Sequence, residues 1–342
     1  MKHLILSDLH FGVKTDDFFI NYQKNYLLSL IEIIKEYNIE NIIVTGDIND
    51  KRKITDNRIL NIFKDIFNEI ERQTNIGYIA IVGNHDMYYK NSHKYNSVGN
   101  FFSDNLKHLS IVDQCYKYKN MVFVPWITTD NYEYVSEFIS KHNSKDNYLF
   151  GHFALKGFKM TGNYTCKKSQ IFKSDYENYA KVFSGHFHNQ QEKDNILYVG
   201  NPWQTNFGEL EKKGCWIFDN DSGEIEFMEN KNNLFEKHFI KDNEDLQGIE
   251  KKLLTITNKY VKIYIDSIDN KYINSIDMII EKLKPKEVDT SIKDLDLEID
   301  EDVDFSIVEN VDKEYFNQLK IENKKVLQEL FKNYEIRNEM ED

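Results

Sequence analysis

The sequence predicts a layered α/β fold, and two features of the chain indicate it. Up to about residue 230, short β runs alternate with segments whose apolar residues recur at helical spacing. Beyond residue 235 the pattern changes to strand, helix and strand, which is typical of a small domain with its own core. We therefore expect a large α/β domain at residues 1–235, a smaller α+β domain at 236–310 and a terminal helical segment at 311–342.

The large domain begins with strands that are followed by helices. The expected strands are 3–7, 41–45 and 77–82, and the expected helices are 18–37 and 59–70. Repeated strand–helix units favour a parallel sheet. Further β runs occupy 121–126, 148–150, 181–184, 196–199, 214–218 and 224–228. Helices are scarcer in this half, so we expect a second, more antiparallel sheet, with a hairpin turn at 219–223.

The last third of the chain has a pattern of its own. Residues 259–266 alternate strictly, which predicts a strand, and residues 273–283 have helical spacing. Another strand is expected at 302–308. The strongly acidic run at 294–304 is typical of a solvated linker. Residues 311–337 carry an apolar stripe on a predicted helix, which fits packing on its own domain and docking on a partner equally well.

Composition narrows the class of protein. A net charge of −13 counts against a nucleic-acid binder that acts alone, because such proteins are usually basic; bound metal ions or a basic partner would offset it. The cysteines Cys115, Cys166 and Cys215 show no paired spacing, which favours a reducing compartment. No stretch approaches the roughly 18 apolar residues of a membrane span, and Asp8 and His10 interrupt any signal peptide. We expect a cytoplasmic protein without membrane contacts.

Side chains able to bind metals follow five of the predicted strands. The clusters are Asp8-Leu9-His10, Gly46-Asp47, Gly83-Asn84-His85-Asp86, Gly151-His152 and Gly185-His186-Phe187-His188. Each cluster alone is weak, since short Asp, Gly and His motifs are common in turns. Together, in this order and each after a β run, they predict one site where the strands end.

The residue types point to two metal ions. Two divalent cations about 3.5–4 Å apart can clamp the attacking and leaving oxygens of a phosphoryl displacement. Such cations repel each other, so a carboxylate must bridge them, and Asp47 is the candidate. A mixed shell of imidazole, carboxylate and amide ligands suits Mn, Fe or Zn better than Mg or Ca. Among these we expect Mn²⁺. A metal-activated water would be the nucleophile, so no Ser or Cys is required.

The ordered motifs resemble those of the calcineurin-like metallophosphoesterase superfamily. The chain is further similar to the SbcD-type DNA repair nucleases within it, and especially to their tailed-phage relatives, the recombination endonuclease subunits. Three segments carry the narrower resemblance: residues 2–12 (KHLILSDLHFG), residues 151–158 (GHFALKGF), and Gly200-Asn201-Pro202-Trp203-Gln204 with Phe207-Gly208-Glu209. The resemblance covers about the first two thirds of the chain. It implies a four-layer αββα sandwich followed by a small capping domain with a possible role in positioning DNA.

The resemblance also implies a role for each site residue. One metal would be bound by Asp8, His10, Asp47 and His188, and the other by Asp47, Asn84, His152 and His186. His85 would face the leaving oxygen as a general acid. Asp86 is predicted to be catalytic together with His85, and it would orient a neighbouring ligand or His85 itself.

One segment departs from the family pattern. After Gly46-Asp47 the repair nucleases usually carry an apolar pair before the next Asp, whereas this chain has Ile48-Asn49-Asp50. The Ser/Thr phosphatases have Asp-Arg-Gly at this point, which the chain lacks, so a protein-phosphatase function is disfavoured. We expect Asp50 to bond to a metal ligand.

Basic residues near the motif loops are candidates for phosphate contacts. The predicted substrate-binding residues are Lys51, Arg52, Lys53, Lys90 and Lys94, with Arg58, Lys167 and Lys168 as further candidates. Tyr88, Tyr89 and Tyr95 interleave with two of the lysines and could stack on bases. Taken alone, each residue fits a solvated lysine or a packed tyrosine better than a substrate contact.

Three functions fit the sequence. The favoured one is a DNA exo/endonuclease subunit that acts with an SbcC-type, SMC-like coiled-coil ATPase, as the resemblance implies, and that forms a homodimer through helix 18–37 or 59–70. The alternative is a stand-alone phosphodiesterase or phosphatase for small nucleotides. The third is a non-catalytic scaffold, which the intact ligand set argues against.

Overall fold

The computed structural model describes residues 1–292 except 103–105, 107, 161–163, 210 and 268. The acidic run at 294–304, the strand expected at 302–308 and the helix expected at 311–337 lie outside the described residues. The described residues all belong to one compact unit. The domain boundaries at 235/236 and 310/311 stay predictions.

The first sheet is mixed and has the strand order β14-β13-β1-β2-β3-β6. Its strands are β1 (Lys2–Leu6), β2 (Ile39–Val44), β3 (Gly77–Ile81), β6 (Leu109–Val112), β13 (Lys213–Asp219) and β14 (Ile225–Asn230). The ladders from β1 to β6 are parallel, and β13 and β14 add antiparallel ladders at one edge. The predicted turn at 219–223 joins β13 to β14, closed by the Gly223 N–H, which donates to the Asp219 carbonyl at 2.8 Å.

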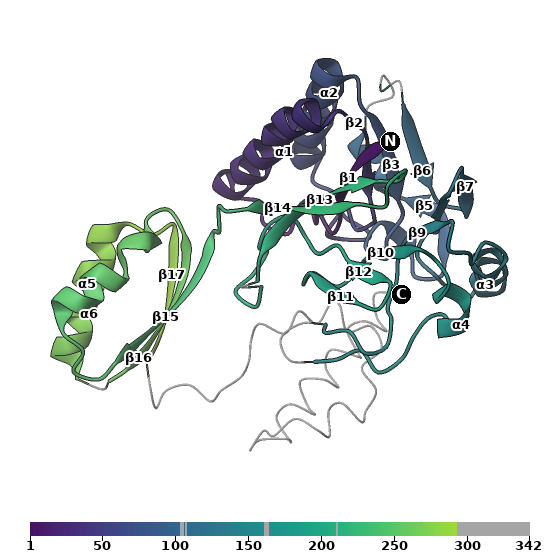
Figure 1. Ribbon diagram of the computed structural model, residues 1–342. Coiled ribbons are helices and arrows are strands. Elements are labelled where there is room, and N and C mark those ends of the chain that lie inside the picture. The colour runs from purple at the N-terminus through teal and green to yellow at the C-terminus, as the bar shows by residue number, and fades with distance from the viewer. Residues whose placement is uncertain (103–105, 107, 161–163, 210, 268, 293–342) are drawn as a thin grey trace. The chain divides into compact units, whose positions relative to one another are not determined.

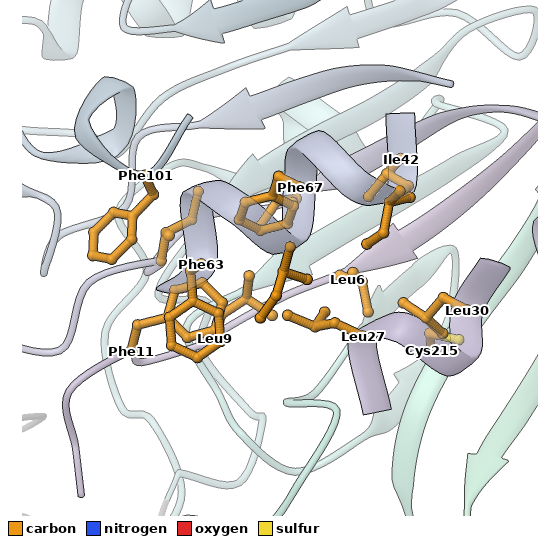
Figure 2. Close-up of a cluster of buried hydrophobic side chains, with 14 of the residues drawn as sticks. Leu6, Leu9, Phe11, Leu27, Leu30, Ile42, Phe63, Phe67, Phe101 and Cys215 are labelled. Atoms are coloured by element: carbon orange, nitrogen blue, oxygen red, sulfur yellow. The ribbon is translucent and has the colours of Figure 1, made fainter. Parts of the chain in front are cut away.

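Two helices, α1 (Asp17–Tyr37) and α2 (Asn57–Thr74), cover the outer face of this sheet (Figure 1). Each begins at an aspartate whose side chain accepts backbone N–H groups, Asp16 for α1 and Asp56 for α2. Figure 2 shows the core beneath them, where Phe11 stacks on Phe63 of α2. Because Phe11 directly follows His10, burying its ring anchors the loop that carries two predicted metal ligands.

The second sheet has the order β11-β12-β10-β9-β8-β7. Its strands are β7 (Tyr116–Tyr118), β8 (Met121–Phe123), β9 (Tyr148–His152), β10 (Lys181–Gly185), β11 (Gln191–Lys193) and β12 (Ile196–Tyr198). The prediction of a more antiparallel sheet was wrong, because β8, β9, β10 and β12 run parallel and only the two edge ladders are antiparallel. Parallel neighbours require crossover connections, and two helices missed from the sequence, α3 (Tyr132–Lys141) and α4 (Lys173–Tyr176), lie in those connections.

The two sheets pack face to face. The layer between them is apolar and includes Ile43 and Ile81 from the first sheet and Phe150 and Phe183 from the second. A separate core on the far side of the second sheet includes Val135 and Ile139 of α3. The order helices, sheet, sheet, helices confirms the predicted four-layer αββα sandwich.

The small domain is built on a three-stranded parallel sheet with its own core. Its elements are β15 (Phe235–Lys241), α5 (Leu246–Lys252), the 3₁₀ turn η2 (Leu254–Ile256), β16 (Tyr260–Asp266), α6 (Asn270–Leu283) and β17 (Glu287–Ile292). The predicted strand and helix correspond to β16 and α6. The flanking strands β15 and β17 were not expected. Among the described residues, no helix has the length and apolar character needed to cross a bilayer.

Candidate metal centre

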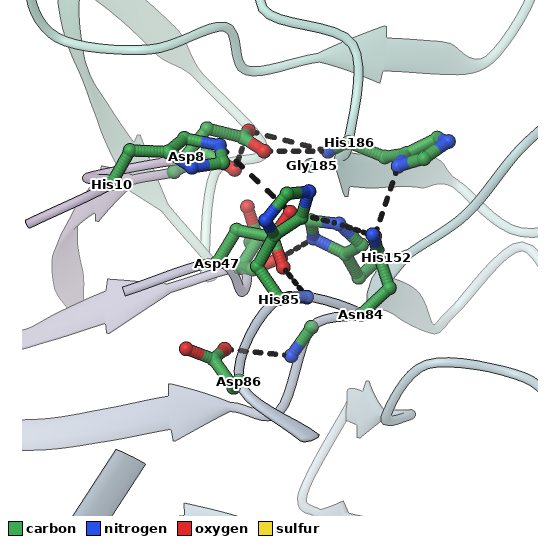
Figure 3. Close-up of polar contacts among 12 residues, drawn as sticks. Asp8, His10, Asp47, Asn84, His85, Asp86, His152, Gly185 and His186 are labelled. Atoms are coloured by element: carbon green, nitrogen blue, oxygen red, sulfur yellow. Dashed lines mark hydrogen bonds and ion pairs between the residues drawn. The ribbon is translucent and has the colours of Figure 1, made fainter. Parts of the chain in front are cut away.

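The predicted ligands follow the carboxyl ends of strands from both sheets. Asp8 comes two residues after β1, Asp47 follows β2 and Asn84 follows β3. On the second sheet, His152 is the last residue of β9 and His186 comes directly after β10. Because these strands run in parallel within each sheet, their ends meet at one edge of the sandwich, where Figure 3 shows the side chains converging.

The backbone at this edge is strained. Asp8, His10, Asp47 and His186 all have positive φ, at 50°, 44°, 52° and 89°. Non-glycine residues rarely adopt this left-handed conformation unless the surrounding structure holds them there. Backbone bonds between the first two loops do so: the Asp8 N–H donates to the Gly46 carbonyl at 3.0 Å and the His10 N–H to the Asp47 carbonyl at 3.1 Å.

Glycine is required where the loops cross. A Cβ on Gly83 would lie 2.2 Å from the Asp47 Oδ1 atom, and one on Gly185 would lie 2.6 Å from the Thr45 carbonyl oxygen. Neither contact can relax without moving a ligand or its supporting loop. The glycines of the motifs therefore let the loops approach closely enough to bring their side chains to one point.

The side chains form two groups, each suited to hold a metal ion. The first consists of Asp8, His10 and His188, and the second of Asp47, His152 and His186, all of them buried. Asn84 joins the second group, since its Oδ1 atom lies 3.0 Å from His152 Nε2 and 3.1 Å from His186 Nδ1.

Asp47 connects the two groups. Its Oδ2 atom is 3.1 Å from His152 Nε2 in the second group and 3.9 Å from His10 Nε2 in the first. A carboxylate oxygen in this position can bind one ion on either side. The bridging role of Asp47 itself stays a prediction.

The arrangement fits cations better than a network of protein hydrogen bonds. The Nε2 atoms of His10 and His188 lie 3.0 Å apart, close enough for both to bind the same cation. Burial by itself lowers the pKa of His10, but a hydrogen bond to Asp50 and the neighbouring carboxylates outweigh it and raise the pKa to about 10. Burial likewise lowers the pKa of His152, and the charge of Asp47 reverses this, giving a pKa of about 9. Both shifts show a local field that favours positive charge.

The sequence matches the family model described as calcineurin-like phosphoesterase over residues 1–190, more than half of its 342 residues. The chain belongs to the calcineurin-like phosphoesterase family. Members of this family bind divalent metals, and the two groups of ligands are this metallophosphoesterase's candidate metal sites.

Two curated proteins and one solved structure are similar to this metallophosphoesterase. It is 27% identical over 332 residues to exonuclease subunit 1 of Enterobacteria phage T4, covering 93% of each chain. It is also 27% identical over 249 residues to the DNA double-strand break repair protein Mre11 of Nanoarchaeum equitans, covering 63% of this chain and 65% of that one. A dimetal phosphatase from Danio rerio matches with a TM-score of 0.38 and 9% identity, over 64% of this chain and 91% of that one.

Hydrogen bonds behind the ligands orient their rings. His152 Nδ1 donates to the Thr45 carbonyl at 2.8 Å, and the Nδ1 atoms of His188 and His10 lie 2.5 Å from Glu209 Oε1 and 3.3 Å from Asp50 Oδ1. In each ring the other nitrogen, Nε2, is left for a metal. The bond expected between Asp50 and a metal ligand is thus present.

His85 is held differently from the metal ligands. Its backbone N–H donates to Asp47 Oδ1 at 2.9 Å, and its Nδ1 atom lies 2.6 Å from the Asp50 carbonyl oxygen. Because a carbonyl can only accept, Nδ1 carries a hydrogen, and Nε2 is the atom that can take up or release a proton. The ring stands nearly perpendicular to that of His10, with 4.9 Å between the centroids.

Asp86 holds the loops together. Its Oδ1 atom accepts the backbone N–H groups of Ile48 and Asn49, and its Oδ2 atom accepts that of Gly83, each at 2.9 Å. These bonds join the loop carrying Asp47 to the loop carrying Asn84. Asp86 therefore fixes the two loops that carry candidate ligands, while its predicted catalytic role stays a prediction. Burial and the charge of Asp47 raise its pKa to about 7.

The sequence reasoning missed a buried network behind His188. Glu209 also accepts from Asn201 and Thr205, and its Oε2 atom lies 3.6 Å from the buried ammonium of Lys213. Burial alone raises the pKa of Glu209, but Lys213 and His188 lower it well below its usual range. The segment containing Glu209 was noted as a family feature. A carboxylate in an otherwise uncharged turn could have identified it as a positioning residue.

Trp126 is a second residue that sequence reasoning missed. Its ring centroid lies 4.9 Å from that of His186 and 5.6 Å from that of His152, and its side chain is half-buried. It therefore forms an aromatic wall beside the second metal group. It was treated only as part of a predicted strand, which in the structure ends at Phe123.

The predicted phosphate-binding residues lie outside the ligand cluster. Lys51, Lys53, Lys90 and Lys94 are exposed, and Arg52 is half-buried. They belong to the loop after β2 and to a hairpin of β4 (Met87–Tyr89) and β5 (Ser92–Asn96), which the short 3₁₀ turn η1 (Val98–Phe101) follows. Arg58 instead pairs with Asp17 Oδ1 at 2.7 Å, which joins α2 to α1, while Lys167 and Lys168 are exposed on another loop.

Proposed function

We propose that this chain is a two-metal-dependent DNA nuclease that hydrolyses phosphodiester bonds, acting as exo- and endonuclease. The observation that carries the proposal is the position of Asp47 Oδ2 between the two ligand groups. The similarity to exonuclease subunit 1 of phage T4 and to an archaeal Mre11 supports DNA as the substrate. The intact ligand set disfavours a non-catalytic scaffold.

One ion would be held by Asp8, His10, Asp47 and His188, and the other by Asp47, Asn84, His152 and His186. When bound, the pair supplies Lewis acidity toward the phosphate and lowers the pKa of water. The donor set contains four imidazoles, two carboxylates and one amide oxygen. This mixture suits Mn²⁺ better than Mg²⁺, which prefers oxygen ligands throughout.

We propose that His85 acts as a general acid and donates a proton to the leaving oxygen. Asp50 fixes Nδ1, so Nε2 is the atom that donates the proton as the phosphodiester breaks. Asp86 contributes by holding the adjacent loops rather than by touching the substrate.

The charge of the chain suggests that it does not act alone. With a net charge of −13, we propose that it binds DNA together with an SbcC-type coiled-coil ATPase, as part of a DNA end-processing and recombination complex. Dimerisation through α1 or α2, and a cytoplasmic location, stay predictions. The same net charge favours the second candidate, a stand-alone phosphodiesterase for small nucleotides, which needs no extended basic surface.

The test is a cleavage assay on linear and hairpin DNA, with and without Mn²⁺ and the ATPase, beside a parallel assay on cyclic nucleotides. We expect Mn²⁺-dependent DNA cleavage that the ATPase stimulates. His85→Ala should lower the rate by about 10²- to 10⁴-fold, the usual contribution of a positioned proton donor. Metal content measured by mass spectrometry should not change.

His142→Ala is the matched control, since that ring lies at the end of α3 and packs on Phe138. Hydrolysis of cyclic nucleotides without DNA cleavage would replace the nuclease proposal with the small-nucleotide one. An unaltered rate in His85→Ala would remove His85 from the mechanism.

A further inference from the structure

Three exposed tyrosines gather on the β4–β5 hairpin, residues 87–96, called the tyrosine hairpin below. Tyr88, Tyr89 and Tyr95 are 44%, 50% and 55% exposed. They form a continuous cluster, because Tyr88 packs edge-on against Tyr89 at 4.8 Å and Tyr89 lies 6.1 Å from Tyr95. The hairpin therefore presents aromatic surface to solvent.

Both ends of the tyrosine hairpin are fixed to the metal centre. Its first strand begins directly after Asp86, and the residue after its second strand, Ser97, donates its backbone N–H to the Asp86 carbonyl at 2.8 Å. Tyr88 is three residues from His85, so their Cα atoms are no more than about 11 Å apart. The base of the hairpin therefore lies beside the candidate metal centre.

The hairpin segment itself is basic although the whole chain is acidic. Residues 87–102 contain no acidic residue and include Lys90 and Lys94. The Lys94 ammonium lies 5.3 Å from the centroid of the Tyr95 ring, and that of Lys53, from the loop after Asp47, lies 6.0 Å from the Tyr88 ring. Ammonium groups thus alternate with aromatic faces along one short surface.

Alternating rings and cations match the chemistry of a single nucleic-acid strand. Every base offers a π-face that stacks on a tyrosine, and every linkage offers a phosphate to a lysine. A duplex keeps its bases stacked inside, so it would meet the lysines but leave the rings unused. A protein partner would not need the concentration of positive charge.

We propose that the tyrosine hairpin is a stacking platform for unpaired nucleobases beside the scissile bond, so that the preferred substrate is single-stranded or locally unpaired DNA. This inference rests on the nuclease function proposed above, because it names the substrate class of the same site. Phosphate contacts from Lys53 and Lys94 hold the strand, and the tyrosines hold the bases.

The binding experiment uses the full chain and a single strand containing 2-aminopurine, a base whose fluorescence falls when it stacks. Ca²⁺ replaces Mn²⁺ so that the strand is bound without being cut. Wild type should quench the fluorescence, and Tyr88→Ala, Tyr89→Ala and Tyr95→Ala should each weaken binding by about 5- to 140-fold. Tyr→Phe variants keep the ring and should bind like wild type.

Tyr118→Ala is the matched control. Tyr118 is 43% exposed and lies beside Lys119, whose ammonium is 5.4 Å from its ring, but it belongs to β7 at the edge of the second sheet. DNA strands with abasic positions give a second test. If a tyrosine stacks on a base, the loss of affinity from removing the base and the loss from removing the ring should not be additive. A duplex of the same sequence should be bound equally by wild type and the alanine variants.

The outcomes separate this inference from the nuclease function. Quenching that the alanine variants lose, in a chain that never cuts DNA, supports the platform and overturns the nuclease proposal. DNA cleavage with unchanged binding in all three variants overturns the platform alone. If the variants change the oligomeric state in sedimentation while quenching persists, the hairpin is an interface between two copies and the platform is overturned.

Discussion

The two halves of the metal centre are supported in different ways. In the first group, His10 and His188 are oriented by the carboxylates of Asp50 and Glu209. In the second group, His152 is oriented by the neutral carbonyl of Thr45. Carboxylates therefore support two rings of the first half, whereas a neutral carbonyl supports His152 in the second half.

The difference indicates unequal affinity. A carboxylate behind a histidine raises the basicity of the ring and so strengthens its bond to a metal. The second group also contains Asn84, a neutral ligand, and shares its Asp47 carboxylate with the first. We expect the first group to bind its ion more tightly, and the second group to lose its ion first when metal is scarce.

The largest effect is expected from Asp47→Asn, which removes the shared charge. Opposite unit charges 4 Å apart attract by about 4 kcal/mol at an effective dielectric of 20, or roughly 1000-fold in binding. Mass spectrometry at limiting Mn²⁺ should therefore find one ion per chain, with DNA cleavage close to background. Asp65→Asn, on the exposed face of α2, is the control. Two retained ions would show that Asp47 does not bridge.

Glu209→Gln tests the support of the first group. We expect metal affinity to fall by about 10- to 100-fold at that group, since this is the usual effect of losing a partner behind a ligand. Thermal stability should also fall, because the buried Lys213 loses its counter-charge. Adding Lys213→Met should restore stability but not affinity. The surface pair Glu229 and Lys212 gives the control, Glu229→Gln, for which almost no change is expected.

A smaller effect is expected from Asp50→Asn. Its bond to His10 is longer, at 3.3 Å, and its side chain is 20% exposed, so we predict about a 10-fold loss of affinity at the first group. Titration with Mn²⁺ and DNA cleavage as the readout would measure it, with the exposed Asp130→Asn as control. If Asp50→Asn lowered metal affinity as much as Glu209→Gln, hydrogen-bond distance and side-chain exposure would not explain the relative importance of Asp50 and Glu209.

The candidate metal ligands could be brought together from the sequence because each lies in a short motif after a β run. Asp8, Asp47 and His186 follow strands that contain short apolar runs, Leu4–Leu6, Ile42–Val44 and Val182–Phe183. Glu209 could not be assigned this way, because it reaches His188 through the folded turn rather than through a motif of its own. Trp126 could not be assigned to the site from the sequence, because only the folded structure brings its ring against those of His152 and His186.

The missed elements share a physical cause. β7 and β11 have three residues each, too few for alternation to be recognised, and β17 is largely polar. Their backbone is extended because a neighbouring strand supplies the hydrogen bonds. Strand direction in the second sheet was likewise invisible, since it depends on crossovers through α3 and α4, the latter only four residues long.

The positive φ angles of Asp8, His10, Asp47 and His186 have a consequence for how this protein can change. Each such residue costs on the order of 1–3 kcal/mol, which the ladders on either side must outweigh. Part of the folding free energy of both sheets therefore offsets the strain of four residues held in an unfavourable backbone conformation. Substitutions that relieve the strain at these positions should raise thermostability and lower activity. We therefore expect the trade-off between stability and activity to be steepest in these loops.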